Sequence, residues 1–170
     1  DLLDVASDVI GPASGSVFSI LGGTVLIDGD LLNLGVGSTL DVPDATVLTV
    51  SGGSLTTGKV LNLAGSLLTS ETLPVVDVTG GSLTANGELA LVQADLVLDN
   101  SLLRQSGGSL SIEGEADAVR VDGVKLTSGA TPVFDFSGGT FAGSDDFFEI
   151  RDGELSSGEA ELGGTLARMT

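Results

Sequence analysis

The chain has 170 residues and a formal net charge of −18, with 24 acidic and 6 basic side chains and no histidine or cysteine. So few cations argue against nucleic acid or an anionic membrane as a partner, because both require clustered basic side chains. The lack of cysteine excludes disulfides and thiolate metal sites, and no apolar run reaches the ~20 residues that a membrane-spanning helix needs. We therefore expect no nucleic-acid partner and no membrane insertion.

The first predicted element is a short strand that begins at Leu3. Leu3-Asp-Val5 alternates apolar and polar residues, and Phe18 starts the next copy of the same pattern fifteen residues later. A rival interpretation is an amphipathic capping helix before Gly11, with its apolar face formed by Leu2, Val5, Ala6, Val9 and Ile10. We favour the strand, which would give the N-terminal coil an open edge able to pair with a further strand.

The same alternating pattern then recurs about every 14 residues, as in Leu48-Thr-Val50-Ser-Gly-Gly-Ser-Leu55. The other copies begin at Leu3, Phe18, Leu32, Leu61, Val76, Leu89, Leu103, Val119, Phe134, Phe148 and Ala160. Period-two alternation bounded by Gly, Ser, Asn and Asp predicts short strands between tight turns. Helix is disfavoured because the 26 glycines interrupt every possible helical face, at roughly 1 kcal/mol for each interior glycine.

A double glycine followed by Ser or Thr and an apolar residue marks every second copy. The phrase occurs at Gly22–Val25, Gly52–Leu55, Gly80–Leu83, Gly107–Leu110, Gly138–Phe141 and Gly163–Leu166. Its spacings of 30, 28, 27, 31 and 25 residues are nearly constant, which is the signature of a repeat protein. Because copies with and without the double glycine alternate, we predict a coil of ~28 residues made of two unlike halves.

These observations predict an all-β fold, a right-handed parallel β-helix (β-solenoid) of about six coils, with residues 1–170 forming one domain. The double glycine is expected to supply a positive φ or a close backbone approach at a corner. The last copy, from Ala160 to Leu166, is shorter and carries Glu159 and Glu161, so it is either a charged cap or a point of continuation. We accordingly expect the domain to be an interior segment or a repeating subunit of a larger assembly.

The alternation also predicts which residues face inward. One wall is expected to contain Phe18, Ile20, Leu48, Val50, Val76, Val78, Leu103, Phe134 and Phe136. The other is expected to contain Leu32, Leu34, Leu61, Leu63, Leu89, Leu91, Val119, Val121, Phe148 and Ile150. Gln105 interrupts the first wall, and we interpret it as a satisfied buried amide or a local register slip.

The intervening, outward positions carry mixed residue types. They are Ser19, Thr49, Asp77, Arg104 and Asp135 on one face and Asn33, Asn62, Ala90, Arg120 and Glu149 on the other. An ice-binding surface would show a regular Thr-x-Thr ladder, which this chain lacks, so that function is not expected.

The chain offers few side chains that could support catalysis. One acidic group contains Asp145, Asp146, Glu149, Asp152 and Glu154, and a group of both signs contains Glu113, Glu115, Asp117, Arg120, Asp122 and Lys125. We interpret the first as a solvated acidic turn, with calcium as the alternative because carboxylate oxygens lie near glycines, and the second as surface ion pairing. We therefore assign no catalytic, cofactor-binding or metal residue and predict no cofactor and no enzymatic activity.

The Gly-Gly-Ser-Leu and Leu-x-Leu-x-Gly-x-x-Leu phrases, which continue over nearly the whole chain, resemble the β-helix stalks of bacterial exoproteins, namely filamentous-haemagglutinin-like adhesins and autotransporter passengers. The coil here is longer than in many of those stalks, and no functional residues carry over. The resemblance implies an extracellular or cell-surface location. We expect a fibre subunit that stacks end to end with copies of itself. The alternatives are an adhesin stalk that binds cell-surface or host ligands and, less favoured, a carbohydrate-active β-helix with a long-loop cleft.

Overall fold

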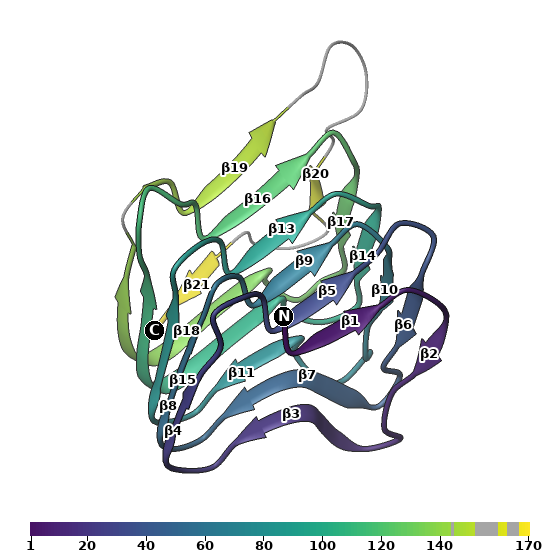
Figure 1. Cartoon of the computed structure of the whole chain (residues 1–170). Helices are drawn as coiled ribbons and strands as arrows, with labels where there is room; N and C mark the ends of the chain where they lie inside the picture. Colours follow the sequence, from purple (N-terminus) through teal and green to yellow (C-terminus); the bar gives the residue numbers. More distant parts are fainter. Residues whose placement is uncertain (144, 152–159, 163–166) are drawn as a thin grey trace.

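The computed structural model describes residues 1–143, 145–151 and 167–170 in full, and residues 160–162 as a strand. The described chain is an all-β parallel solenoid of about five turns (Figure 1). Every strand pair is parallel and joins one coil to the next, and no described residue is helical. The fold class is therefore confirmed, whereas the prediction of six coils was one too many.

The strands stack into four sheets. Sheet A contains β1 (Leu3–Val5), β5 (Leu32–Leu34), β9 (Leu61–Leu63), β13 (Ala90–Val92), β16 (Val119–Asp122) and β19 (Phe148–Arg151). Sheet B contains β2 (Val9–Ile10), β6 (Thr39–Asp41) and β10 (Ser66–Leu68), and sheet D contains β14 (Leu96–Leu98), β17 (Leu126–Ser128) and β20 (Ala160–Leu162).

Sheet C is bent at the double glycines. Its first half contains β3 (Gly15–Ile20), β7 (Ala45–Val50), β11 (Val76–Val78) and β21 (Ala167–Met169), and its second half contains β4 (Thr24–Leu26), β8 (Ser54–Thr57) and β12 (Ser82–Ala85). The long strands β15 (Leu103–Ile112) and β18 (Phe134–Ala142) run through both halves. A coil thus passes along both halves of sheet C, then sheet A, then sheet B or D, as in β7, β8, β9 and β10.

The two unlike halves of the predicted repeat correspond to two parts of this path. The first five copies with the double glycine form sheet C, and copies without it form sheet A with the following strand of sheet B or D. Leu48 pairs with Val76, a spacing of 28 residues. The coil of ~28 residues is confirmed.

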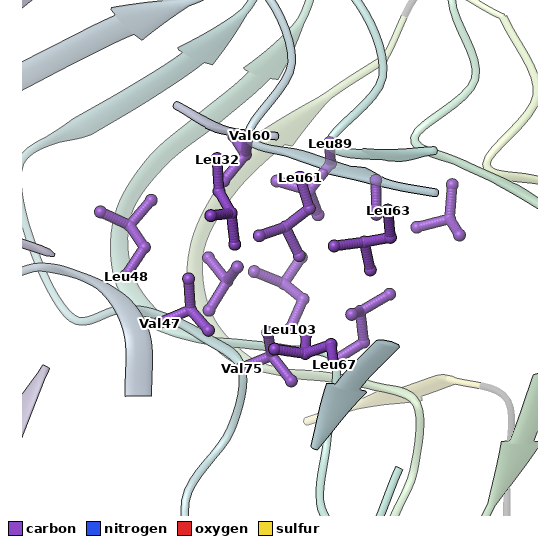
Figure 2. Close-up of a cluster of buried hydrophobic side chains, with 14 of the residues drawn as sticks. Leu32, Val47, Leu48, Val60, Leu61, Leu63, Leu67, Val75, Leu89 and Leu103 are labelled. Carbon is purple, nitrogen blue, oxygen red and sulfur yellow. The ribbon is translucent and has the colours of Figure 1, made fainter. Parts of the chain in front are cut away.

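The core lies between the sheets and consists almost entirely of leucine and valine. Figure 2 shows Leu32, Leu61 and Leu63 of sheet A facing Leu48 and Leu103 of sheet C. Each of these side chains is at most 1% exposed. Side chains at one position stack on the equivalent side chains of the coils above and below, because the strands are paired in register.

One inward assignment was wrong by one residue. Ala90 and Val92, not Leu89 and Leu91, stack on Leu61 and Leu63. Both Leu89 and Ala90 are fully buried, because the chain points two consecutive side chains inward where sheet A begins. Because every residue from Leu89 to Val92 is apolar, either alternate pair could have been assigned to the inward face. The prediction chose the pair that does not follow the alternation of the strand. Leu91 therefore takes the outward position predicted for Ala90, next to Asn62.

The double glycines are required at their corner for both of the predicted reasons. Gly53, Gly81 and Gly108 have φ of +70°, +69° and +68°. A Cβ on any of the three would lie 2.4–2.5 Å from a carbonyl oxygen of the preceding coil, which is closer than any real contact. The motif therefore fixes both the turn and the backbone approach between coils.

The two ends of the chain give opposite outcomes. β1 is a strand paired with β5, which confirms the strand interpretation and rules out a capping helix at Leu2–Ile10. At the other end, the repeat pattern groups the copy at Ala160 with the double-glycine copies, but Ala160–Leu162 pairs with β17 in sheet D. Ala167–Met169 takes the sheet C position instead.

Candidate functional site

The outward face of sheet C carries a ladder of polar side chains along the solenoid, and its last four members alternate between negative and positive charge. Its positions, one per coil, are Ser19, Thr49, Asp77, Arg104, Asp135 and Arg168. The five that were predicted for this face are confirmed as a stack. Arg168 was missed because it lies beyond the displaced last copy, where the spacing no longer follows the repeat.

The charges of this ladder are paired between coils. Arg104 donates from Nε and Nη2 to the two carboxylate oxygens of Asp77, at 3.0 and 2.6 Å. Arg168 donates in the same bidentate way to Asp135. Asp77 and Asp135 are only 8% and 9% exposed, and the hydrogen bonds to Asp77 raise the pKa of Arg104 above its usual value. The ladder therefore joins successive coils by oriented ion pairs, which are stronger than neutral hydrogen bonds.

The outward face of sheet A carries a polar ladder with different contacts. Asn33 donates from Nδ2 to Asp4 at 2.9 Å, and Asn62 donates from Nδ2 to Asp30 at 3.1 Å. Arg120 forms an ion pair with Glu88 at 2.6 Å. Ion pairing was predicted for Arg120, but its partner lies outside the predicted group, because Glu88 is brought beside it by the coil below.

Members of the two predicted charged groups meet at the start of β19. One carboxylate oxygen from each of Asp117, Asp145 and Asp146 lies within 4.8 Å of the other two. Asp117 is 5% exposed, and burial, followed by its hydrogen bond with Glu149, raises its pKa to about 6. Glu149 contacts Arg151 at 2.8 Å, and that hydrogen bond lowers the pKa of Glu149. Asp152 and Glu154 of the predicted group lie outside the described residues.

The position of this acidic group suggests metal binding rather than a reaction. Carboxylate oxygens are the ligands that calcium prefers, but below a pH of about 6 calcium would have to displace the proton of Asp117. Other members of the predicted groups lie apart: Glu113 and Glu115 are exposed in the turn after β15, and Asp122 ends β16. The geometry does not identify a reaction.

The end coils expose the edges of strands. At the N-terminal end, β1 and β3 each have a partner strand on one side only, in sheets A and C respectively. At the C-terminal end, β19 and β21 are the last described strands of the same two sheets. Figure 1 places these two ends on opposite sides of the stack. Unpaired N–H and C=O groups at such edges can pair with another strand.

Gln105 lies beside a cavity of about 330 Å³ at the C-terminal end. As predicted, it occupies the position of Val50 and Val78 and is 1% exposed. Both interpretations were right in part. Its Nε2 donates to the carbonyl oxygen of Thr140 at 2.9 Å, whereas its Oε1 has no partner. The pairing of β15 with β18 shifts register immediately after Gln105.

The fold and its ladders thus define a parallel β-solenoid, compatible with a β-helix protein. No protein-family model matches the chain, and no curated protein or solved structure is significantly similar to it. No helix in the described part of the chain is long and apolar enough to cross a membrane.

Proposed function

We propose that this chain is a structural, extracellular β-solenoid that builds a cell-surface fibre by end-to-end stacking of its coils. The observation that carries the proposal is the pair of open strand edges in the same two sheets at opposite ends (Figure 1). Its function is mechanical and involves neither catalysis nor a resident cofactor. The resemblance of its repeats to those of bacterial adhesins and autotransporter passengers supports the cell-surface setting.

The two ends fit each other in sheet C. If β3 of one copy follows β21 of the next, Ile20 lies opposite Met169 and Phe18 lies opposite Ala167, continuing the register of the lower coils. Met169 is 82% exposed in the single chain. Its burial at a joint would therefore add apolar contact to the backbone hydrogen bonds.

The charges at the joint oppose the association of two copies. In sheet A the same stacking places Asp4 opposite Glu149, and each copy carries a net charge of −18. Like charges directly opposite each other destabilise a strand pair, and the net charge repels copies at long range. Salt screens this repulsion, so assembly is expected to increase with ionic strength.

Electron microscopy of the purified chain tests the proposal. We expect filaments with an axial repeat of ~4.8 Å, more abundant at high salt, with calcium and sodium compared at equal ionic strength. Dispersed short rods under every condition would contradict self-assembly and favour the alternative, a stalk segment of a secreted adhesin. In an adhesin, the same edges would continue covalently into further coils.

A matched pair of variants locates the joint. The carbonyl of Ile20 accepts from Ser51 of the next coil, so the backbone N–H of Ser19 points to the open side of β3. Ser19→Pro removes this donor without removing a bond to β7, whereas Ser19→Ala keeps it. Filaments from Ser19→Ala but not from Ser19→Pro are expected, with the same circular dichroism for both. Filaments from both would exclude this edge from the joint.

A further inference from the structure

One wall of the solenoid is interrupted between two central coils. The coil of β7–β10 and the coil of β11–β14 are joined in register at three places, where β7 pairs with β11, β8 with β12 and β9 with β13. On the remaining side β10 (Ser66–Leu68) ends sheet B and β14 (Leu96–Leu98) begins sheet D, so these neighbouring strands share no ladder (Figure 1). We call the junction between β10 and β14 the seam.

A side-chain hydroxyl replaces the backbone ladder at the seam. The hydroxyl of Thr69, the residue after β10, donates to the carbonyl oxygen of Val97 at 3.3 Å and accepts from the N–H of Asp99 at 3.4 Å. In a parallel ladder, two groups spaced in this way bond to the N–H and C=O of one residue on the neighbouring strand. Thr69 therefore makes with its side chain the two bonds that its backbone would make in a continuous sheet.

The junctions on either side of the seam have shorter bonds. Below it, the N–H of Val42 donates to the carbonyl of Leu68 at 3.0 Å, and above it the N–H of Gly129 donates to the carbonyl of Leu98 at 2.9 Å. Both contacts of the Thr69 hydroxyl exceed the usual ranges, which are about 2.7–3.2 Å for an N–H donor and about 2.5–3.0 Å for an O–H donor. The seam is therefore the most weakly bonded junction of this wall among the described strands.

The link that follows β10 is longer than its counterpart in the coil below. Residues 69–75 connect β10 to β11, whereas residues 42–44 connect β6 to β7. Within the longer link, the buried hydroxyl of Ser70 accepts from two N–H groups of the same link, at 3.2 and 3.3 Å. Nδ2 of Asn100, in the coil above, donates to the carbonyl of Glu71 at 3.4 Å. The link therefore turns on itself and adds only a further long bond between the two coils.

Apolar packing behind the seam limits how far it can open. Leu67 of β10 and both Leu96 and Leu98 of β14 belong to the core, and each is at most 3% exposed. A wide opening would bring these side chains into water, which is unfavourable in proportion to the apolar area exposed. We therefore expect movements of small amplitude rather than separation of the two coils.

We propose that the seam is a hinge at which the solenoid bends. Sheets A and C stay paired through the hinge, while the wall formed by sheets B and D opens and closes. Bending there breaks long side-chain hydrogen bonds and no strand ladder. Local motions of a fold are drawn from its least stable contacts. The hinge lies inside the single chain, between central coils, and does not rest on end-to-end stacking.

Amide hydrogen exchange of the full chain, followed by NMR at low ionic strength, measures opening of the seam. Asp99 and Gly129 each follow the last residue of their strand, but only the N–H of Asp99 bonds across the seam. We expect the protection factor of Asp99 to be about tenfold lower than that of Gly129. Equal protection of the two amides would overturn the proposal, because it would show a wall that is closed at the seam.

A matched pair of variants assigns the exchange to the Thr69 hydroxyl. Thr69→Val removes the hydroxyl at nearly constant shape and should lower the protection of Asp99 by about a further threefold. Thr69→Ser keeps the hydroxyl and should leave that protection as in the wild type. The amide of Val42, which bonds in the junction below, should be unchanged in both variants. An unchanged Asp99 in Thr69→Val would contradict a role for this hydroxyl in closing the seam.

Distances between two spin labels measure the bending itself, and the chain contains no cysteine that would have to be removed first. Ile10→Cys with Thr127→Cys places the labels four coils apart on the wall that contains the seam. Leu26→Cys with Ala142→Cys is the control, also four coils apart but on the continuous sheet C. At ~4.8 Å for each coil, both pairs span about 19 Å, which double electron–electron resonance can measure.

We expect a broader distance distribution for the pair across the seam than for the control pair. Adding Thr69→Val should broaden the first distribution further and leave the second unchanged. Equal widths for the two pairs would overturn the hinge. Filaments from a chain with equal widths would overturn the hinge alone, and a broad distribution in a chain that forms only dispersed rods would overturn the fibre alone.

Discussion

The central coils and the end coils are built from the same repeat, but its apolar residues and glycines make fewer contacts in the end coils. Leu55 and Leu83, in central coils, are fully buried, whereas Val25, which takes the same position in the first coil, is only partly buried. Leu26, at the next and outward position of that coil, is 69% exposed. A Cβ on Gly81 would meet the backbone of the coil below, whereas a Cβ on Gly23 would meet nothing within 4 Å. The motif specifies the path of the chain, and only stacking converts that path into stability.

The last coil also differs from the central ones in its aromatic content. Five of the six phenylalanines lie within it, namely Phe134, Phe136, Phe141, Phe147 and Phe148. The rings of Phe134 and Phe147 lie 4.5 Å apart in an edge-to-face arrangement. Large rings cover more apolar surface than leucine, so they fill part of the space that an upper coil would otherwise fill.

The largest expected difference between the two regions is at the Gly-Gly corner. Gly81→Ala combines a φ of +69° with a Cβ 2.5 Å from the Gly53 carbonyl oxygen, so we expect a loss of more than about 3 kcal/mol in the free energy of unfolding. Gly23→Ala has the same kind of φ, +77°, but open space, and should cost about 1–2 kcal/mol. Urea unfolding measures both. Equal losses would show that backbone conformation alone, without coil-to-coil contact, sets the cost.

Burial gives the next largest difference. Leu61→Ala removes a fully buried side chain from the leucine stack and should cost about 2–5 kcal/mol. Leu26→Ala, in β4, should change stability by less than about 0.5 kcal/mol. The same urea titrations compare them. A large effect at Leu26 would mean that its exposed face is covered in solution, as a stacked copy would cover it.

The charge ladder should give a smaller difference. Arg104→Met leaves the nearly buried Asp77 without its cation, and we expect a loss of about 1–2 kcal/mol. Arg151→Met breaks a solvent-exposed pair with Glu149 and should leave the unfolding midpoint unchanged. In a double-mutant cycle, Asp77→Asn should remove much of the effect of Arg104→Met. Additive losses would contradict pairing between these coils.

The sequence predicted the fold well because its signals were local and repeated. The alternation around Leu48 and Val50 and the spacing of the glycine pairs determine strand, coil length and corner without any long-range information. The failures occurred where a local pattern admits two interpretations. At Leu89–Val92 both alternations are apolar, and at Ala160 the last copy is shorter than the others.

The candidate sites were less predictable because they depend on which coils become neighbours. Arg120 was correctly expected to form an ion pair, but Glu88 is 32 residues away and belongs to the coil below. The meeting of Asp117 with Asp145 and Asp146 likewise joins two groups that were separate in the sequence.

The smallest expected effect is a pH dependence confined to the last coil. Burial and the neighbouring Glu149 raise the pKa of Asp117 to about 6, from a usual value near 4. Between these two values the folded chain holds a proton that the unfolded chain has released, so the free energy of unfolding should fall as pH rises from about 4 to 6 and level off above it. Asp145 also raises the pKa of Asp117, whereas Arg151 lowers it.

Asp117→Asn should remove this pH dependence. Between pH 4 and pH 7 the wild-type chain should therefore lose up to about 1 kcal/mol of its free energy of unfolding relative to the variant. The effect is this small because part of the pKa shift is shared with the more exposed Glu149. Asp4→Asn, at the opposite end of the solenoid, is the control and should leave that part of the profile intact. Urea titrations of the three proteins across this pH range measure the effect. A wild-type profile that matches Asp117→Asn throughout would show that this carboxyl is ionised in the folded chain. A hard cation could then bind the three carboxylates without first displacing a proton.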